Sequence, residues 1–327
     1  MIAITFYLCY RTKNKEELES IENKIEDAVK NAGDTDVIDG YFTKAKYQIS
    51  IGDFAAADAS FDVILSKPKT VTGKKIDAYM EKAKVGLFTL DTTKLNASIN
   101  EAKKLNETGG DWDRRNRLKI YEAFYLLHTR EVKEAAKLLL DCVATFTCTE
   151  LCTYTQFMFY VLVTSIITLD RNYLRKKVIK DPNVITLIRE LPNAQKLVQS
   201  IYNCNYAAFF QAIVPIHDEL QENRFLAPLS TYLVREYRVL AYSQFLEAYK
   251  SVMLSSMAAS FGITVTLLDS ELSRFIAAGR LNAKIDKVGD IVETRRPDKK
   301  NAQYHEIIKK GDVLLNHIQK LVRAIDV

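Results

Sequence analysis

Four histidines and five cysteines are the residues of this 327-residue chain best suited to metal binding or nucleophilic chemistry. The histidines lie far apart, and none belongs to an H-E-x-x-H pattern or to a Cys/His spacing that binds zinc. They are His128, His217, His305 and His317. Cys142, Cys148 and Cys152 share one stretch, but no nearby His or Asp completes a tetrahedral site with them. We interpret these cysteines as small buried hydrophobic residues.

Two further motifs of catalytic proteins are incomplete. Thr72-Gly-Lys-Lys75 imitates the end of a phosphate-binding loop, but the first Gly of G-x-x-x-x-G-K-[ST] and the final Ser or Thr are absent. No G-x-S-x-G sequence would place a serine nucleophile on a strand-to-helix turn. The sequence therefore predicts a protein that is not an enzyme and that needs no cofactor and no metal.

The composition favours a helical protein of about two domains. Apolar residues make up 48% of the chain, and 11 Gly with 6 Pro are too few for the frequent turns of an all-β fold. A net charge of +5 from 46 basic and 41 acidic residues indicates no particular partner. An odd number of cysteines without a C-x-x-C pair fits a reducing compartment, so we expect the cytoplasm and nucleus.

Two apolar stretches could be mistaken for targeting or membrane segments. Met1 to Tyr10 has no basic residue before it and no A-x-A cleavage pattern after it, so it lacks the parts of a secretory signal. Leu151 to Leu169 carries no charge, but six of its 19 residues are polar. This pattern favours a helix buried inside a helical protein over a membrane span. We therefore expect no contact with a membrane.

A helical repeat begins near Tyr41. Its sequence resembles a tetratricopeptide-type hairpin, in which small residues allow two helices to cross and a Gly opens the turn between them. The residues that carry this pattern are Ala45, Gly52, Asp53, Phe54, Ala57 and Phe61. Counting on from Ala57 leads to Ala97 and Ala135, with Arg130-Glu131-Val132 in place of Gly-Asp-Phe and Leu139 in place of Phe61. We predict an irregular helix-pair solenoid; the alternative is three unrelated hairpins.

Helical periodicity continues through the middle of the chain. The predicted helices cover residues 154–170, 183–190, 193–203, 206–222 and 230–250. Pro182, Pro192, Pro215 and Pro228 are expected at helix starts or stops.

The pattern changes from about residue 251. An apolar helix ends at Gly262, and Thr266 to Asp269 resembles a capping box that opens a second helix, which ends at Gly279. Leu281 to Asp286 alternates like a half-buried strand, and a turn leads to a second strand that begins at Ile291. Two helices followed by a hairpin predict a winged helix.

A winged helix can bind DNA or another protein, and the charges favour a protein. The second helix, which would enter the major groove, carries Asp269 and Glu271 against Arg274 alone, so it would repel phosphate. Exposed wing strands can instead extend the sheet of a neighbouring protein. We predict contacts at Ile285, Val288 and Ile291, and no nucleic acid.

The last segment, residues 299–327, reads as one amphipathic helix. Ile307, Leu314 and Leu321 recur every seven residues, and Ile318 and Ile325 follow the last two by four. The helix either packs on its own domain or joins a bundle with other chains, and the sequence leaves both open. The predicted contact residues are Leu314, Ile318, Leu321 and Ile325.

The single tryptophan marks another candidate contact. Trp112, followed by Arg114 and Arg115, has the composition of an interface anchor beneath a charged rim. The same residues could instead begin a solenoid helix, with Asp113 near its positive end.

Three stretches resemble one family of PCI-domain subunits of the 26S proteasome lid, non-ATPase regulatory subunit 6. They are Gly109 to Tyr121, Leu272 to Leu281 with Lys284 to Val288, and Ile291 to Asp298, and the resemblance runs from about residue 36 to 326. It implies a mainly α protein with a tetratricopeptide-like arm (1–150), a PCI domain of helical bundle and winged helix (151–298), and a C-terminal helix (299–327). The implied function is that of a noncatalytic lid scaffold in ubiquitin-dependent protein degradation. The implied partners are other PCI-domain lid subunits and regulatory-particle subunits, in a hetero-oligomer.

The N-terminus of the chain differs from this family, and one other family has the same architecture. Met1 to Thr12 does not resemble the family, which usually has a longer helical region before the first hairpin. The first subunit of the COP9 signalosome shares the expected architecture and is the closest alternative, but the Trp112 motif favours the proteasome.

Overall fold

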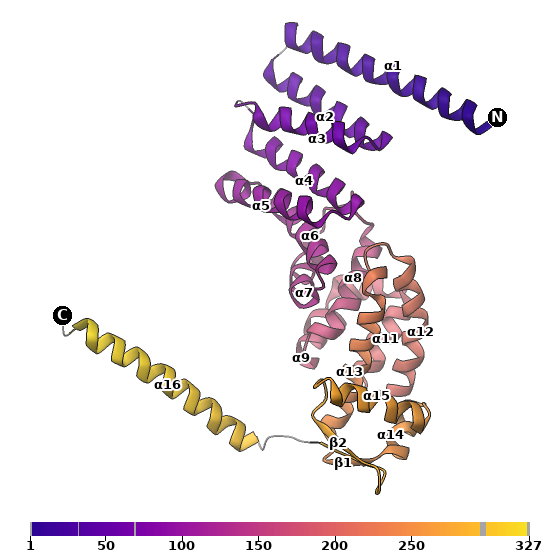
Figure 1. The fold of residues 1–327 in the computed structure, drawn as a ribbon, viewed down its shortest axis with the longest axis vertical. Coiled ribbons are helices and arrows are strands. Elements are labelled where there is room, and N and C mark those ends of the chain that lie inside the picture. Colours follow the sequence, from indigo (N-terminus) through magenta and orange to yellow (C-terminus); the bar gives the residue numbers. More distant parts are fainter. Residues whose placement is uncertain (1, 32, 69, 295–298, 326–327) are drawn as a thin grey trace. The chain divides into compact units, whose positions relative to one another are not determined.

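Most of the chain is helical in the computed structural model, which describes residues 2–31, 33–68, 70–294 and 299–325 (Figure 1). The side chains of residues 1–11, 295–302 and 324 are not described. The described residues divide into two compact units: 1–198 with 215–233, and 199–214 with 234–327. The predicted mainly α fold is confirmed. The predicted domain bounds at residues 150 and 298 stay predictions.

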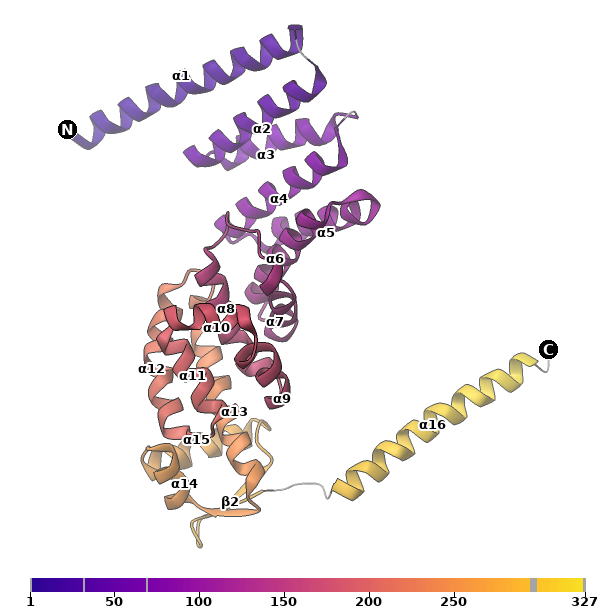
Figure 2. The same ribbon diagram turned by 180° about the vertical axis from the view of Figure 1, so that it is seen from behind.

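The first unit begins with a stack of helices. These are α1 (Ile2–Asn31), α2 (Asp34–Ile51), α3 (Phe54–Ser66), α4 (Thr72–Thr89), α5 (Thr92–Gly109), α6 (Trp112–His128) and α7 (Val132–Asp141). The pairs α2–α3, α4–α5 and α6–α7 are antiparallel hairpins that follow one another in both views (Figures 1 and 2).

The three hairpins share one turn. Gly52, Leu90 and Arg130 adopt the left-handed conformation, with φ of 90°, 60° and 67°. The residue after each donates its N–H to the carbonyl five positions back, at 2.8–3.0 Å, which closes the C-terminus of the preceding helix. The turns are spaced by 38 and then 40 residues. This recurrence favours true repeats over three unrelated hairpins.

The predicted counterpart of Ala57 in the middle repeat is wrong. Ala97 is exposed, and counting from the shared turn shows that Leu95 and Ala135 take the place of Ala57. Both are buried, as are Ile99 and Leu139 in the place of Phe61. The error arose because the middle turn contains no glycine, so the sequence offered nothing from which to count.

Arg130 is strained in this turn, so Arg130→Gly is expected to stabilise the chain by about 0.5–1 kcal/mol. Glycine adopts a positive φ without the Cβ clash, and the Arg130 side chain is exposed with no carboxylate of the described residues within ion-pair distance. Thermal unfolding measures the effect. Gly52→Ala, which introduces a Cβ at a φ of 90°, should lower the melting temperature instead.

The helices that follow the three hairpins cover residues 154–248. They are α8 (Tyr154–Thr168), α9 (Arg171–Leu174), a π-helical turn (Arg175–Ile179), α10 (Pro182–Leu187), α11 (Pro192–Tyr202), α12 (Tyr206–Glu222) and α13 (Ser230–Ala248). The predicted burial of α8 is confirmed, since Phe157 to Ile166 are all buried. None of the described helices is both long and apolar enough to cross a membrane. Pro215 lies inside α12 and is neither its start nor its end, contrary to the prediction, because buried Ile213 and Ile216 on either side hold the helix in place.

The winged helix has one more strand than predicted. Its elements are β1 (Ser251–Met253), α14 (Leu254–Phe261), α15 (Val265–Ala277), β2 (Ala283–Asp286) and β3 (Ile291–Thr294). The sheet has the order β1-β3-β2, with Val252 and Ile285 both opposite Val292. Gly262 ends α14 in the left-handed conformation, as predicted. The predicted capping box is wrong, because Thr264 precedes α15 and Thr266 lies within it.

Candidate protein-interaction surfaces

Trp112 lies at the first position of α6 and is 59% exposed. The backbone N–H of Trp112 donates to the Asp111 carboxylate at 2.7 Å, so Asp111 caps the start of the helix. The indole ring of Trp112 lies outside the core. A large aromatic side chain in this position contributes little to the fold and is available to a partner.

Trp112→Ala is therefore expected to leave the melting temperature within about 2 °C of the parent, because surface substitutions change stability by about 0.5 kcal/mol or less. If the indole anchors a partner, the variant enters its complex more weakly. Co-purification with the partner complex measures this. Unchanged incorporation of the folded variant would show that Trp112 is not an anchor.

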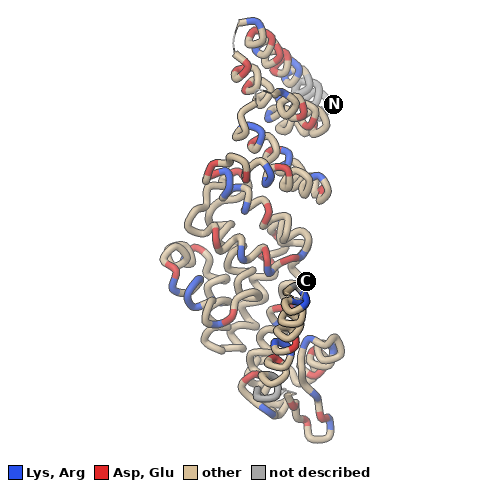
Figure 3. Tube along the Cα trace, turned by 90° about the vertical axis from the view of Figure 1, so that its left-hand side faces the viewer, with Lys and Arg blue, Asp and Glu red and all other residues tan. Residues whose placement is uncertain are grey.

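Arg114 is engaged within the chain. Its Nε and Nη2 donate to the two carboxylate oxygens of Asp77 on α4, each at 2.9 Å, and this pairing raises the pKa of Arg114. One repeat earlier, Lys74 on α4 pairs with Asp39 on α2 at the equivalent positions. Such pairs are possible because basic and acidic residues are interspersed along the helices (Figure 3). Arg114 thus joins two successive repeats, and its guanidinium is not free for a partner.

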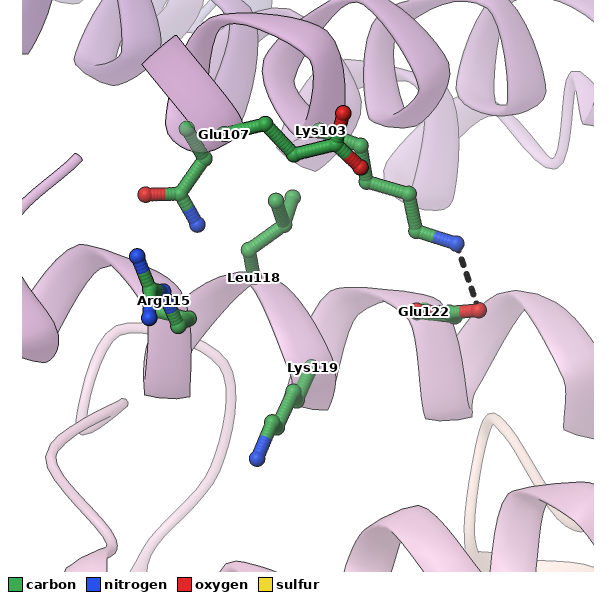
Figure 4. A pocket seen from close by; sticks show the side chains of 7 residues that line it. Lys103, Glu107, Arg115, Leu118, Lys119 and Glu122 are labelled. Carbon is green, nitrogen blue, oxygen red and sulfur yellow. Dashed lines mark hydrogen bonds and ion pairs between the residues drawn. The ribbon is translucent and has the colours of Figure 1, made fainter. Parts of the chain in front are cut away.

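Arg115 borders a cleft of about 400 Å³ between α5 and α6 (Figure 4). At the other end of the cleft, Lys103 of α5 donates to Glu122 of α6 at 2.6 Å. Arg115 itself is exposed. Of the three residues predicted in this motif, Trp112 and Arg115 are exposed, whereas Arg114 is partly buried and paired with Asp77.

The backbone next to this cleft requires glycine at position 110. A Cβ on Gly110 would lie 2.8 Å from the Cα of Asn106 and still closer to its side-chain oxygen. A Cβ on neighbouring Gly109 would meet nothing within 4 Å.

Gly110→Ala is expected to lower stability by about 1–3 kcal/mol, the usual effect of overpacking. Gly109→Ala is the matched control, and we expect it to change stability by less than about 0.5 kcal/mol. Chemical denaturation of the two variants provides the comparison. Equal stability of the two would show that the turn absorbs the added methyl group.

The cysteine cluster offers no reactive thiol. Burial raises the pKa of Cys142 and Cys148 to about 11 and that of Cys152 to about 12. Thiols with such pKa values stay protonated and unreactive at neutral pH. Across the described residues, no group of three or more His, Cys, Asp or Glu side chains is arranged to hold a metal ion.

The wing presents its predicted residues unequally. Val288, at the tip of the hairpin, is 99% exposed, whereas Ile285 and Ile291 are only half-buried in the two strands. β1 and β2 are the edges of the three-stranded sheet. An edge strand can pair with a strand of another protein through main-chain hydrogen bonds.

The predicted charge of α15 needs correction. Glu271 is buried, where it accepts hydrogen bonds from Arg238 and from the Tyr242 hydroxyl at 2.7 Å. Asp269 pairs with Lys287 of the wing at 3.1 Å. The exposed face of α15 is therefore nearly uncharged rather than negative, and it consists of Val265, Thr266, Leu267, Ser273, Arg274 and Ala277. One arginine on this face is still too little to attract the phosphates of DNA.

Helix α16 (Lys299–Ile325) leaves its apolar stripe uncovered. Leu314, Ile318, Leu321 and Ile325 are 52 to 72% exposed. Exposed apolar residues at this spacing along one helix are typical of a surface that packs on another helix.

Comparison with known proteins decides the family. A family model described as 26S proteasome subunit RPN7 matches residues 6–177, more than half of the chain. The chain belongs to the RPN7 family. A PCI-domain model matches residues 195–296, and a model of the RPN7/PSMD6 C-terminal helix matches residues 303–325. The last of these covers most of α16.

Relatives of the RPN7 family align with almost the whole chain. The 26S proteasome non-ATPase regulatory subunit 6 homolog of Arabidopsis thaliana is 46% identical over 317 residues, which cover 97% of this chain and 81% of the relative. The corresponding subunit of Dictyostelium discoideum is 43% identical, over 97% of this chain and 83% of the relative. The regulatory subunit RPN7 of Saccharomyces cerevisiae is 38% identical, over 96% and 74%.

The RPN7 match extends the resemblance toward the N-terminus. It begins at residue 6, whereas the motifs indicated a start near residue 36 and excluded Met1 to Thr12. That exclusion is wrong for residues 6–12.

Proposed function

We propose that this chain is a noncatalytic scaffold subunit of the lid of the 26S proteasome regulatory particle. This proposal is supported by the RPN7 family models, which match residues 6–177 and 303–325. It is also supported by relatives that align over 97% of the chain. In this role the chain supports ubiquitin-dependent protein degradation by holding other subunits in place.

The surfaces of the two units support a scaffold role. The repeat arm is held together by ion pairs between successive hairpins, such as Arg114 with Asp77, which make it a firm support. The winged helix has a sheet edge for strand pairing, and α16 carries an uncovered apolar stripe. We propose that other PCI-domain lid subunits bind these two surfaces, that the assembly is a hetero-oligomer without nucleic acid or membrane, and that it acts in the cytoplasm and nucleus.

The proteasome is favoured over the COP9 signalosome. The RPN7 family model and the three relatives described above are all proteasome subunits. The nearly neutral face of α15 disfavours the remaining alternative, a winged helix that reads DNA.

Mass spectrometry of the proteins that co-purify with the tagged chain from its own cells, at moderate salt, tests the proposal. Lid subunits and proteasomal ATPases are the expected result. Recovery of signalosome subunits would instead indicate that the chain is a subunit of the COP9 signalosome. A lone chain, or one that carries nucleic acid, would refute the scaffold function.

A further inference from the structure

Helix α9 continues into the π-helical turn Arg175–Ile179, and residues 171–180 together form what we name the basic turn. Its sequence, Arg-Asn-Tyr-Leu-Arg-Lys-Lys-Val-Ile-Lys, has five basic residues and no acidic one. Leu174 and Val178 are buried and hold the segment against the first unit. The basic side chains at 175, 176, 177 and 180 are all exposed.

Four exposed cations of the basic turn have no carboxylate partner among the described residues. No carboxylate of the described residues lies within ion-pair distance of Arg175, Lys176, Lys177 or Lys180. The carboxylate of Asp181, next along the chain, accepts the N–H of Asn183 and caps α10 instead. Elsewhere in the same unit some cations, such as Arg114 and Lys103, are paired, and others stand singly, so the basic turn differs from them in having four such cations within six residues. Like charges at this density repel one another unless an anion binds between them.

The backbone of the basic turn is unusual. Lys180 donates its N–H to the carbonyl of Arg175 at 3.0 Å, five residues back, which defines a π-helical turn. Leu174 and Val178 are buried, and the three basic residues between them are exposed. Turns of this kind are rare, and they often occur at functional sites.

We propose that the basic turn binds a phosphorylated segment of a partner protein. A phosphate group carries a charge of about −1.5 to −2 and three acceptor oxygens, which match several cations from consecutive residues better than one carboxylate does. Arg175 supplies a guanidinium fork that can donate twice to one phosphate, and the lysines add point charges. Tyr173, exposed two residues earlier, offers apolar contact to the rest of the segment.

The short extent of the basic turn favours a protein segment over a nucleic acid. Asp170 and Asp181 border the turn on both sides, and the next basic residue, Arg189, is followed by Glu190. A strand of nucleic acid presents phosphates continuously and is bound by longer basic surfaces. One or two clustered phosphates need no more than this segment offers.

Fluorescence anisotropy with the full chain tests the proposal. The probe is a labelled 12-residue Gly/Ser peptide with two adjacent phosphoserines, compared with the same peptide carrying serine or glutamate and with a single-stranded RNA of equal charge. The bisphosphorylated peptide should bind more tightly than the other three. The double variant Lys176→Gln/Lys177→Gln should weaken its binding by about tenfold or more, as the loss of two charge-assisted hydrogen bonds predicts.

The matched control is Lys133→Gln/Lys137→Gln, which removes two exposed lysines from α7. It should change the affinity by less than about twofold, because these lysines lie outside the basic turn. Equal loss in the control, or equal binding of the glutamate peptide, would overturn the proposal, since either result indicates unspecific charge attraction. Tighter binding of the RNA would assign the turn to nucleic acid instead. Lys180→Gln provides a second variant if the double substitution perturbs the fold.

Discussion

Deletion of residues 299–327, which include α16, is expected to leave a folded chain that no longer enters the proteasome lid. Leu314, Ile318, Leu321 and Ile325 are more than half exposed, so their loss uncovers no core in the described structure. A helix of a partner protein can bury this apolar stripe. Its burial stabilises the complex by about 25 cal/mol for each Å² of apolar surface removed from water. Thermal unfolding measures the first expectation and co-purification with lid subunits the second.

A narrower variant separates the apolar stripe from the helix that carries it. Leu314→Asp/Leu321→Asp places two charges in the stripe, whereas Asn316→Asp/Gln319→Glu adds two charges at other positions of the same helix. Only the first variant should lose incorporation, because a buried unpaired charge is costly and an exposed one is not. A large fall in melting temperature for the first variant would mean that α16 packs on its own domain, the alternative that the sequence left open.

Glu271→Ala is expected to destabilise the winged helix by about 2–4 kcal/mol. The carboxylate is buried and accepts hydrogen bonds from Arg238 and Tyr242 of α13, so it joins α15 to that helix. Its removal leaves the guanidinium and the hydroxyl without an acceptor, which costs about 3–5 kcal/mol for a fully buried pair. Because the Arg238 side chain is 38% exposed, water offsets part of this loss. Chemical denaturation of the full chain, followed by a probe in the second unit, measures the change.

Asp269→Ala is the matched control on the same helix. Asp269 pairs with Lys287, whose side chain is largely exposed, and such surface pairs contribute about 0–1 kcal/mol. A similar loss in the two variants would show that the burial of Glu271 is not what stabilises the helix pair.

The sequence by itself determined the elements whose signals are local. Gly52-Asp53-Phe54 predicted the first repeat turn. Glycine adopts a positive φ there, and the Asp53 carboxylate accepts the backbone N–H of Ala56 at 3.1 Å, which caps the next helix. The uncharged run of α8 predicted its burial, and the heptad spacing of α16 predicted its apolar stripe. The motifs around Trp112 and in the winged helix indicated the family that the comparisons established. Each of these depends on residues a few positions apart.

The tertiary structure alone decided the features that depend on distant residues. Leu90 and Arg130 adopt the same turn as Gly52 although neither residue favours it, because the helices packed on either side impose the conformation. β1 is a strand only because β3, about 40 residues later, pairs with it. Arg114 links two repeats, and Glu271 joins two helices, through partners 29 to 37 positions away in the sequence. Local propensity carries no information about such contacts, and they determine which charged side chains remain available to bind other proteins.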